Sequence, residues 1–116
     1  MNIDIIEVNR NDKICEVEYN IIDTDINEMV GYLFTVKVLG QTHIAYEVKE
    51  KYRGNNIATK ALEIITNKIS CPVLEITHDN MASKRVAIKA GYTLVKSGEY
   101  FEIYKFYNKK KIKQFS

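Results

Sequence analysis

The residues best suited to chemistry lie between positions 43 and 62, where a short strand pattern leads into a polar loop and then an amphipathic helix. The loop contains Arg53 and Gly54, and either Asn55 or Asn56 is suited to cap the helix. This order directs backbone N–H groups and the positive end of a helix dipole to one point. Such a point binds phosphate or pyrophosphate, which predicts a ligand such as a nucleotide-bearing cofactor.

A second polar segment follows the strand pattern over residues 73–77 and begins another helix. Asp79 or Asn80 is suited to cap this helix, and Gly91 ends it as a C-cap glycine does. Its predicted apolar stripe comprises Ala82, Val86 and Ala90. Because residues 73–77 follow the first helix, they are expected to run parallel to the strand before the loop, as in a βαβ unit.

Alternating and β-branched segments predict strands over most of the chain. The predicted strands cover residues 3–8, 14–22, 31–39, 43–48, 73–77, 92–96 and 100–107. The first helix has a buried side formed by Ile57, Ala61, Ile64, Ile65 and Ile69. We therefore expect an α/β (α+β) fold with a mixed, mostly antiparallel sheet and two main helices, in the order β-β-β-β-α-β-α-β-β.

The length of 116 residues predicts one domain over residues 1–107, followed by a basic tail over residues 108–116. No apolar run approaches the roughly 20 residues that span a bilayer, and the acidic N-terminus does not resemble a signal peptide. Cys15 and Cys71 have apolar neighbours and are expected to be buried free thiols of a cytoplasmic protein. Residues 47–96 hold nine basic and five acidic side chains, which suits an anionic ligand.

Two motifs, in this order, resemble those of the GNAT superfamily of acyl-CoA-dependent N-acetyltransferases, and most closely its ribosomal-protein N-terminal acetyltransferase group. The family's cofactor loop corresponds to residues 53–58, with Asn56 in place of the usual central glycine. The second motif is Asn80, the small residue Ser83, and a glycine–aromatic pair eleven residues after the asparagine. The resemblance covers about residues 30–107, and the chain is shortened where the family has two N-terminal helices. Asparagine tolerates positive φ better than other non-glycine residues, so the loop turn can form.

The resemblance implies that acetyl-CoA binds between two diverging strands. Its pantetheine arm would pair with the backbone near Val48 and Lys49, Asn80 would hold the pantetheine amides, and Lys84, Arg85 or Lys89 would lie near the phosphates. The full expected cofactor set comprises Val48, Lys49, Arg53, Gly54, Asn55, Asn56, Ile57, Ala58, Thr59, Asn80, Ser83, Lys84 and Lys89. A backbone N–H near Val48 would serve the thioester oxygen.

The same resemblance implies a base for the attacking amine and an acid for the leaving thiolate. His43 falls where many members carry a catalytic glutamate, and Glu47 is the second choice; the alternative for each is a strand residue without a catalytic role. Ala87 stands at the position of the family's usual tyrosine acid, which leaves Ser83 or solvent as the proton donor. The alternative for Ser83 is a first-turn helix residue without a catalytic role. His78 either lines the acceptor pocket or is a polar residue at the junction of a strand and a helix, and we expect the second. No metal site is expected.

The resulting hypothesis is an enzyme that transfers an acetyl group from acetyl-CoA to a primary amine by direct transfer in a ternary complex. The acceptor is a peptide or protein N-terminus, a lysine or a small amine. The shortened N-terminal part implies an acceptor pocket that is open to large substrates or completed by a second subunit in a homodimer. A second hypothesis is a catalytically reduced CoA-binding module that senses or scaffolds. A third is a binder of nucleic acid or an acidic partner through the basic tail.

Overall fold

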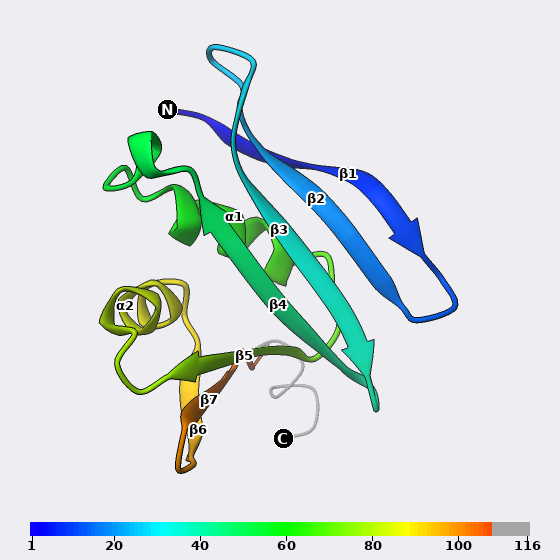
Figure 1. Ribbon diagram of the computed structural model, residues 1–116, viewed down its shortest axis with the longest axis vertical. Coiled ribbons are helices and arrows are strands. Elements are labelled where there is room, and N and C mark those ends of the chain that lie inside the picture. The colour runs from blue at the N-terminus through cyan, green and yellow to red at the C-terminus, as the bar shows by residue number, and fades with distance from the viewer. Residues whose placement is uncertain (108–116) are drawn as a thin grey trace, which may run out of the picture.

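The computed structural model of the chain describes residues 1–107, in which the strands and helices follow the predicted order (Figure 1). The elements are β1 (Ile3–Asn11), β2 (Glu16–Asp23), β3 (Glu28–Val38), β4 (Gln41–Val48), the short 3-10 helix η1 (Glu50–Tyr52), α1 (Ile57–Thr66), β5 (Pro72–Thr77), α2 (Met81–Lys89), β6 (Thr93–Ser97) and β7 (Phe101–Lys105). The predicted basic tail, residues 108–116, lies outside the described residues. None of the helices in the described part of the chain is long and apolar enough to cross a membrane.

All seven strands form one sheet in the order β1-β2-β3-β4-β5-β7-β6. The first four strands are sequential antiparallel neighbours, and β4 and β5 form the only parallel pair within residues 1–107. The C-terminal hairpin joins β5 through β7, so that β6 is an edge strand. This confirms the mixed, mostly antiparallel sheet that the sequence predicts.

The strands β4 and β5 diverge soon after they meet. They pair only at Thr42 with Pro72 and at His43 with Val73, which confirms the predicted splay. We call the divergence beyond these two pairs the fork. In Figure 1, α2 lies where the two strands separate. The backbone edge of β4 after His43 therefore has no strand beside it.

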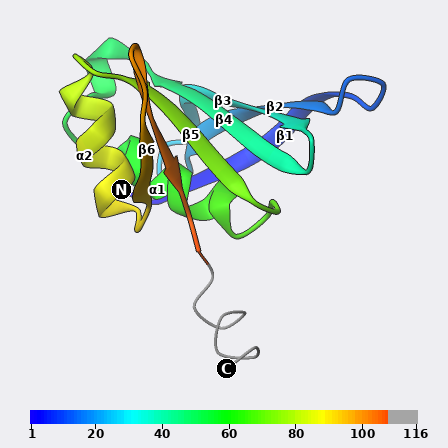
Figure 2. The same cartoon turned by 90° about the horizontal axis from the view of Figure 1, so that it is seen from below.

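The core lies between the sheet and α1, which is seen behind β3 and β4 in Figure 1 and below the sheet in Figure 2. The helix residues Ala61, Leu62 and Ile65 are fully buried, as expected for apolar residues at helical spacing. They pack against the sheet face that carries Ile21 and Leu33. Among residues 1–107, no helix covers the opposite face of β1–β4, which we call the open face.

The buried side of α2 differs from the predicted stripe. Ala82 is exposed, whereas Ala87 is fully buried with Ala90, and Ser83 and Val86 are half-buried. Residues spaced by four advance about 40° around a helix at each step, so Ala82 rotates away from a side centred near Ala87. The same rotation turns Ser83 inward.

The first helix is shorter than its apolar spacing predicts. It ends at Thr66, before Ile69, and Asn67 is its C-cap. The Thr66 hydroxyl donates to the carbonyl of Leu62 and also shares a hydrogen bond with the Tyr92 hydroxyl at 2.5 Å. Ile69 is half-buried but lies in the connection to β5.

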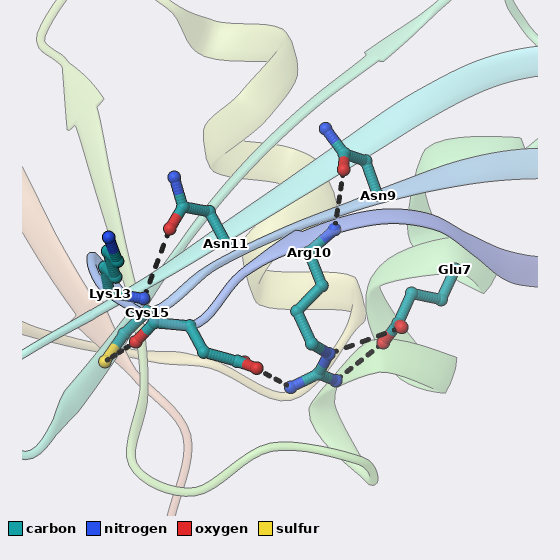
Figure 3. A network of polar contacts seen from close by, with 7 residues as sticks. Glu7, Asn9, Arg10, Asn11, Lys13 and Cys15 are labelled. Carbon is teal, nitrogen blue, oxygen red and sulfur yellow. Dashed lines mark hydrogen bonds and ion pairs between the residues drawn. The ribbon is translucent and has the colours of Figure 1, made fainter.

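The expectation of two buried cysteines is wrong, although both thiols are free. Cys15 and Cys71 are exposed and lie in the connections before β2 and β5, with φ of 54° and 48°. Figure 3 shows the turn between β1 and β2 that contains Cys15. There the guanidinium of Arg10 pairs with Glu7 at 2.6 Å and with Asp12 at 3.5 Å. Apolar sequence neighbours therefore did not imply burial, because Ile14 lies in the same turn as Cys15 and is itself exposed.

Candidate functional site

A cavity of about 680 Å³ lies at the fork. Its walls come from the end of β4, the loop that follows η1, the first turn of α1, and one side of α2. The lining residues are Tyr46, Glu47, Val48, Tyr52, Arg53, Gly54, Asn56, Ile57, Ala58, Thr59, Asn80, Ala82, Ser83, Arg85, Val86 and Lys89. The fold thus brings together most of the two polar segments that the sequence predicts as one site.

The edge of β4 offers unpaired backbone groups to this cavity. The N–H of Lys49 donates to Val30 in β3 at 2.8 Å, and the N–H of Thr42 donates to Cys71 on the other side at 2.9 Å. Hydrogen bonding alternates along an antiparallel strand, so Tyr46 and Val48 direct their backbone groups toward the fork, away from β3. An extended ligand can pair with them as a further strand does.

The loop before α1 ends in a left-handed turn. Gly54 has φ of 87°, which glycine adopts freely, and Asn56 has φ of 59°, which confirms that asparagine accepts the turn. Asn56 is the N-cap residue of α1, but its side chain makes no capping hydrogen bond. The first N–H groups of a helix have no partner within it, so those of α1 remain available to an anion in the cavity.

Three cationic side chains line the cavity near this helix end: Arg53, Arg85 and Lys89. The Nε of Arg53 donates to the carbonyl of Val48 at 3.0 Å, which ties the loop to β4. The Nζ of Lys89 donates to Oδ1 of Asn56 at 3.4 Å, which bridges α2 and the loop. These cations and the uncapped helix end give this part of the cavity a positive potential.

Three residues of the expected cofactor set lie outside the cavity lining: Lys49, Asn55 and Lys84. The amide of Asn55 donates instead to the carbonyl of Tyr52 at 3.0 Å. The Nζ of Lys84 donates to the carbonyl of His78 and pairs with Glu102, both at 2.7 Å. Lys84 lowers the pKa of the Glu102 carboxyl. Because both ends of this ion pair are mostly buried, Lys84 joins α2 to β7.

The first turn of α2 forms the opposite wall. The Oδ1 of Asn80 accepts from the N–H of Ser83 at 3.1 Å, which confirms Asn80 as the N-cap. Ser83 is half-buried and lines the cavity.

Tyr46 faces this wall from β4, and the sequence analysis did not single it out. Its hydroxyl is buried and has no hydrogen-bond partner within residues 1–107. Burial raises the pKa of the Tyr46 hydroxyl, and the nearby Ser83 side chain offsets part of the rise, although no Ser83 atom meets the limits for a hydrogen bond with it. The alternation of the β4 segment could have indicated Tyr46, because this residue lies on the same side of the strand as the buried Ile44 and Val48.

The two candidate bases, Glu47 and His43, lie on the open face. Tyr46 pairs with the core residue Leu33, so its side chain lies on the helix side, and residues 47 and 43 alternate to the opposite face. Glu47 lines the cavity, accepts from the Tyr32 hydroxyl at 2.6 Å and lies 3.6 Å from Arg53 Nη2. This hydrogen bond raises the pKa of Tyr32. His43 lies at the closed end of the fork, outside the lining, with Nδ1 3.5 Å from Glu75 Oε1.

His78 makes a hydrogen bond through Nε2 to the carbonyl of Gly98 at 2.6 Å, as a polar residue at a strand end does. Within residues 1–107, no group of three or more His, Cys, Asp and Glu side chains is arranged to hold a metal ion.

Solved acetyltransferases have a similar fold. RimL, a ribosomal alpha-N-protein acetyltransferase in complex with coenzyme A, is 24% identical, with a TM-score of 0.67 over 78% of this chain and 60% of that one. The GNAT domain of S. lividans PAT is 18% identical, with a TM-score of 0.70 over 84% of this chain and 63% of that one. The aminoglycoside acetyltransferase AAC(6')-Ib, in complex with coenzyme A and kanamycin, is 14% identical, with a TM-score of 0.69 over 86% and 70%.

No family model and no curated protein sequence matches this chain. The structural likeness, at low sequence identity, shows that the chain has the GNAT fold, which confirms the predicted resemblance at the level of the fold. The chain spans 60% of the length of the RimL chain.

Proposed function

We propose that this protein is an N-acetyltransferase that moves an acetyl group from acetyl-CoA to a primary amine. The observation that carries the proposal is the cavity at the fork, which runs from the unpaired edge of β4 to the uncapped N-terminus of α1. Together these features match a ligand with an extended polar arm and a diphosphate. The GNAT fold, and the coenzyme A bound to two similar structures, support the same ligand.

The residues present fit coenzyme A. The N–H groups at the start of α1 suit the pyrophosphate, and Arg53, Arg85 and Lys89 supply positive charge beside them. The backbone groups of Tyr46 and the N–H of Val48 suit the amides of the pantetheine arm, whereas the carbonyl of Val48 already accepts from Arg53 Nε. Bound acetyl-CoA supplies an acetyl group on a thioester, which a neutral amine attacks readily.

The acceptor amine approaches from the open face in this proposal. Glu47 lies on that face, lines the cavity, and is oriented by Tyr32 and Arg53, so it is the better-positioned base. His43 remains the second candidate, about 14 Å from Glu47 along β4 at roughly 3.4 Å per residue. A carboxylate at this place accepts the proton that the amine loses.

The acceptor belongs to the amine class: a peptide or protein N-terminus, a lysine or a small amine. Because no helix within residues 1–107 covers the open face, a large acceptor reaches the fork without displacing an element. A second copy of the chain covering part of this face would narrow the choice to smaller amines.

A CoA-binding module without catalysis is the second candidate, and one observation favours it. Ala87 is fully buried and brings no hydroxyl to the cavity, at the position where the family usually has a tyrosine acid. Such a module would bind CoA and acetyl-CoA equally well and release no thiol.

Calorimetry with CoA and an assay of thiol release against a panel of amines and peptides test the proposal. We expect one molecule of CoA bound per chain and acetyl-CoA turnover with at least one amine class. Arg85→Ala should weaken CoA binding, whereas the control Lys96→Ala, outside the cavity lining, should not. Binding without turnover on the whole panel would support the module, and absence of CoA binding would contradict both functions.

A further inference from the structure

The Tyr46 hydroxyl is the one polar side-chain group within residues 1–107 that is fully buried without a hydrogen-bond partner. Buried polar groups are nearly always paired, so an exception needs an explanation, and a catalytic role is one. The hydroxyl belongs to a residue that lines the cavity, so a ligand there can supply the partner.

The position of Tyr46 along β4 indicates which part of the ligand it meets. The diphosphate end of the proposed ligand lies at the start of α1, beyond Val48. Tyr46 lies two residues back toward the closed end of the fork, about 7 Å along the strand. An arm that starts at the helix end and follows β4 toward the fork therefore brings its far end, which carries the sulfur, past Tyr46.

Three neighbouring residues indicate which role the Tyr46 hydroxyl has. Ser83, half-buried in the opposite wall, is close enough to affect the Tyr46 hydroxyl. Ala87, in the next turn of α2, is buried and has no hydroxyl. Glu47 lies on the other face of the sheet, where the amine arrives. Beside Tyr46, the helix side of the cavity thus offers the hydroxyls of Tyr46 and Ser83, whereas the Glu47 carboxylate lies on the open face.

We propose that Tyr46 is a catalytic residue whose hydroxyl, with Ser83 beside it, donates its proton to the sulfur that leaves the thioester; this rests on the proposed function. The amine nitrogen forms a bond to the acetyl carbon, and the bond from that carbon to sulfur breaks with its electron pair on sulfur. The sulfur takes the proton of Tyr46, and the phenolate regains a proton from water. Glu47 takes the proton that the amine loses and releases it to water.

The Tyr46 hydroxyl holds a proton before the reaction begins. Burial raises the pKa of Tyr46 above its ordinary value near 10, so the hydroxyl carries its proton at neutral pH. A tyrosine from a strand thereby supplies the function for which α2 has only Ala87 and Ser83.

The test compares the binding of CoA and desulfo-CoA, which lacks the sulfur, to the wild-type protein, Tyr46→Phe and Tyr19→Phe. The control Tyr19→Phe also removes a hydroxyl from a half-buried sheet tyrosine, outside the cavity lining. Wild type and control should bind CoA about fivefold more tightly than desulfo-CoA, as one hydrogen bond gives. Tyr46→Phe should bind both alike. On any amine that the wild type acetylates, Tyr46→Phe should lower kcat by about 100-fold and leave KM for acetyl-CoA within twofold.

The outcomes separate this inference from the proposed function. If the wild type binds neither ligand, the proposed function fails, and the role of Tyr46 fails with it. If CoA binds but Tyr46→Phe keeps the preference for the sulfur, or keeps full turnover, only the role of Tyr46 is overturned. Adding Ser83→Ala to Tyr46→Phe should cost little more than the worse single change, because two groups that act as a unit are not additive. Full additivity would overturn the shared role of the two hydroxyls.

Discussion

Tyr46 and Glu47 are consecutive residues of β4 whose side chains lie on opposite faces of the sheet, yet both line the same cavity. Successive side chains of any strand alternate between faces, but in a continuous sheet the next strand separates them. Here β5 has already diverged from β4, so the cavity joins the helix side to the open face. A thioester on one side and an amine on the other can therefore meet through the fork.

Glu47→Gln should lower kcat by about 100-fold with little change in CoA affinity, because the amide cannot accept the proton of the amine. His43→Ala should lower it less than threefold, since His43 lies outside the cavity and contacts Glu75. Steady-state kinetics on one acceptor measure both. The reverse order of effects would assign the base to His43.

Lys89→Ala and Lys84→Ala are a matched pair on α2. Lys89 lines the cavity, so its loss should weaken CoA binding by about tenfold, the value of one charge-assisted hydrogen bond. Lys84 pairs with Glu102, so its loss should lower Tm and leave CoA affinity unchanged. Calorimetry and thermal unfolding separate the two. Weakened CoA binding in Lys84→Ala with an unaltered Tm would instead show that Lys84 contacts the phosphates of CoA.

The Lys84–Glu102 pair also predicts a pH dependence. Lys84 holds the pKa of Glu102 below its ordinary value, so the pair stabilises the fold at neutral pH. This contribution is lost as the pH falls through the lowered pKa of Glu102. The difference in Tm between wild type and Lys84→Ala should therefore shrink in acid, and a constant difference would contradict the pairing.

Gly31→Ala should damage the site without touching the ligand. A Cβ at Gly31 would lie 2.4 Å from the carbonyl oxygen of Glu47 and 3.0 Å from Cα of Val48. Backbone atoms cannot yield as a flexible side chain does, so β4 must move where it forms the cavity wall. We expect lower Tm and weaker CoA binding together. If the folded Gly31→Ala variant bound CoA as tightly as the wild type, the displacement of β4 would not affect the cavity.

Tyr46→Phe and Tyr92→Phe should change stability in opposite directions. The first removes a buried hydroxyl without a partner, which should raise the free energy of unfolding by about 1 kcal/mol. The second removes the hydrogen bond to Thr66, which should lower it by about 1 kcal/mol. Urea unfolding of the ligand-free proteins measures both. A large loss of stability in Tyr46→Phe would mean that its hydroxyl already has a partner.

Alkaline unfolding should report Tyr92. Burial raises the pKa of Tyr92 to about 12, whereas the unfolded chain ionises near 10. The raised pKa means that stability is intact below pH 10 and falls between pH 10 and 12, by up to about 1.4 kcal/mol per pH unit. In urea titrations at pH 9 to 11, the free energy of unfolding of Tyr92→Phe should fall less steeply with pH than that of the wild type. An unchanged slope would show that other tyrosines cause the loss of stability.

The order of elements and the two halves of the site could be predicted because their signals are local. Alternation marks the strands, and Gly54 and Asn80 mark a turn and a cap that need no distant partner. The strand–loop–helix–strand order predicted that β4 and β5 run parallel, and the resemblance to the GNAT superfamily implied that they diverge. These features depend on residues that are adjacent in the sequence.

The rest depends on partners far along the chain. The Lys84 side chain points toward β7 because it pairs with Glu102 there. The Tyr46 hydroxyl lies near Ser83 on α2, which is 37 residues away in the sequence. Spacing by four residues wrongly placed Ala82 on the buried side of α2. Which side of the helix is buried depends on how the helix packs against the rest of the fold, and the spacing alone does not fix it. The burial of Cys15 was predicted wrongly because Cys15 and its apolar neighbour Ile14 both lie in the exposed turn before β2.

Titration of ¹⁵N-labelled protein with CoA, followed by amide chemical shifts, tests the central claim most directly. If the ligand lies along the edge of β4 with its diphosphate at the start of α1, the amides of Tyr46, Val48 and residues 54–59 should shift together and saturate at one equivalent. Amides of β1 and β6 should stay unchanged. Saturable shifts confined to other segments, or none at a millimolar excess of CoA, would contradict the account.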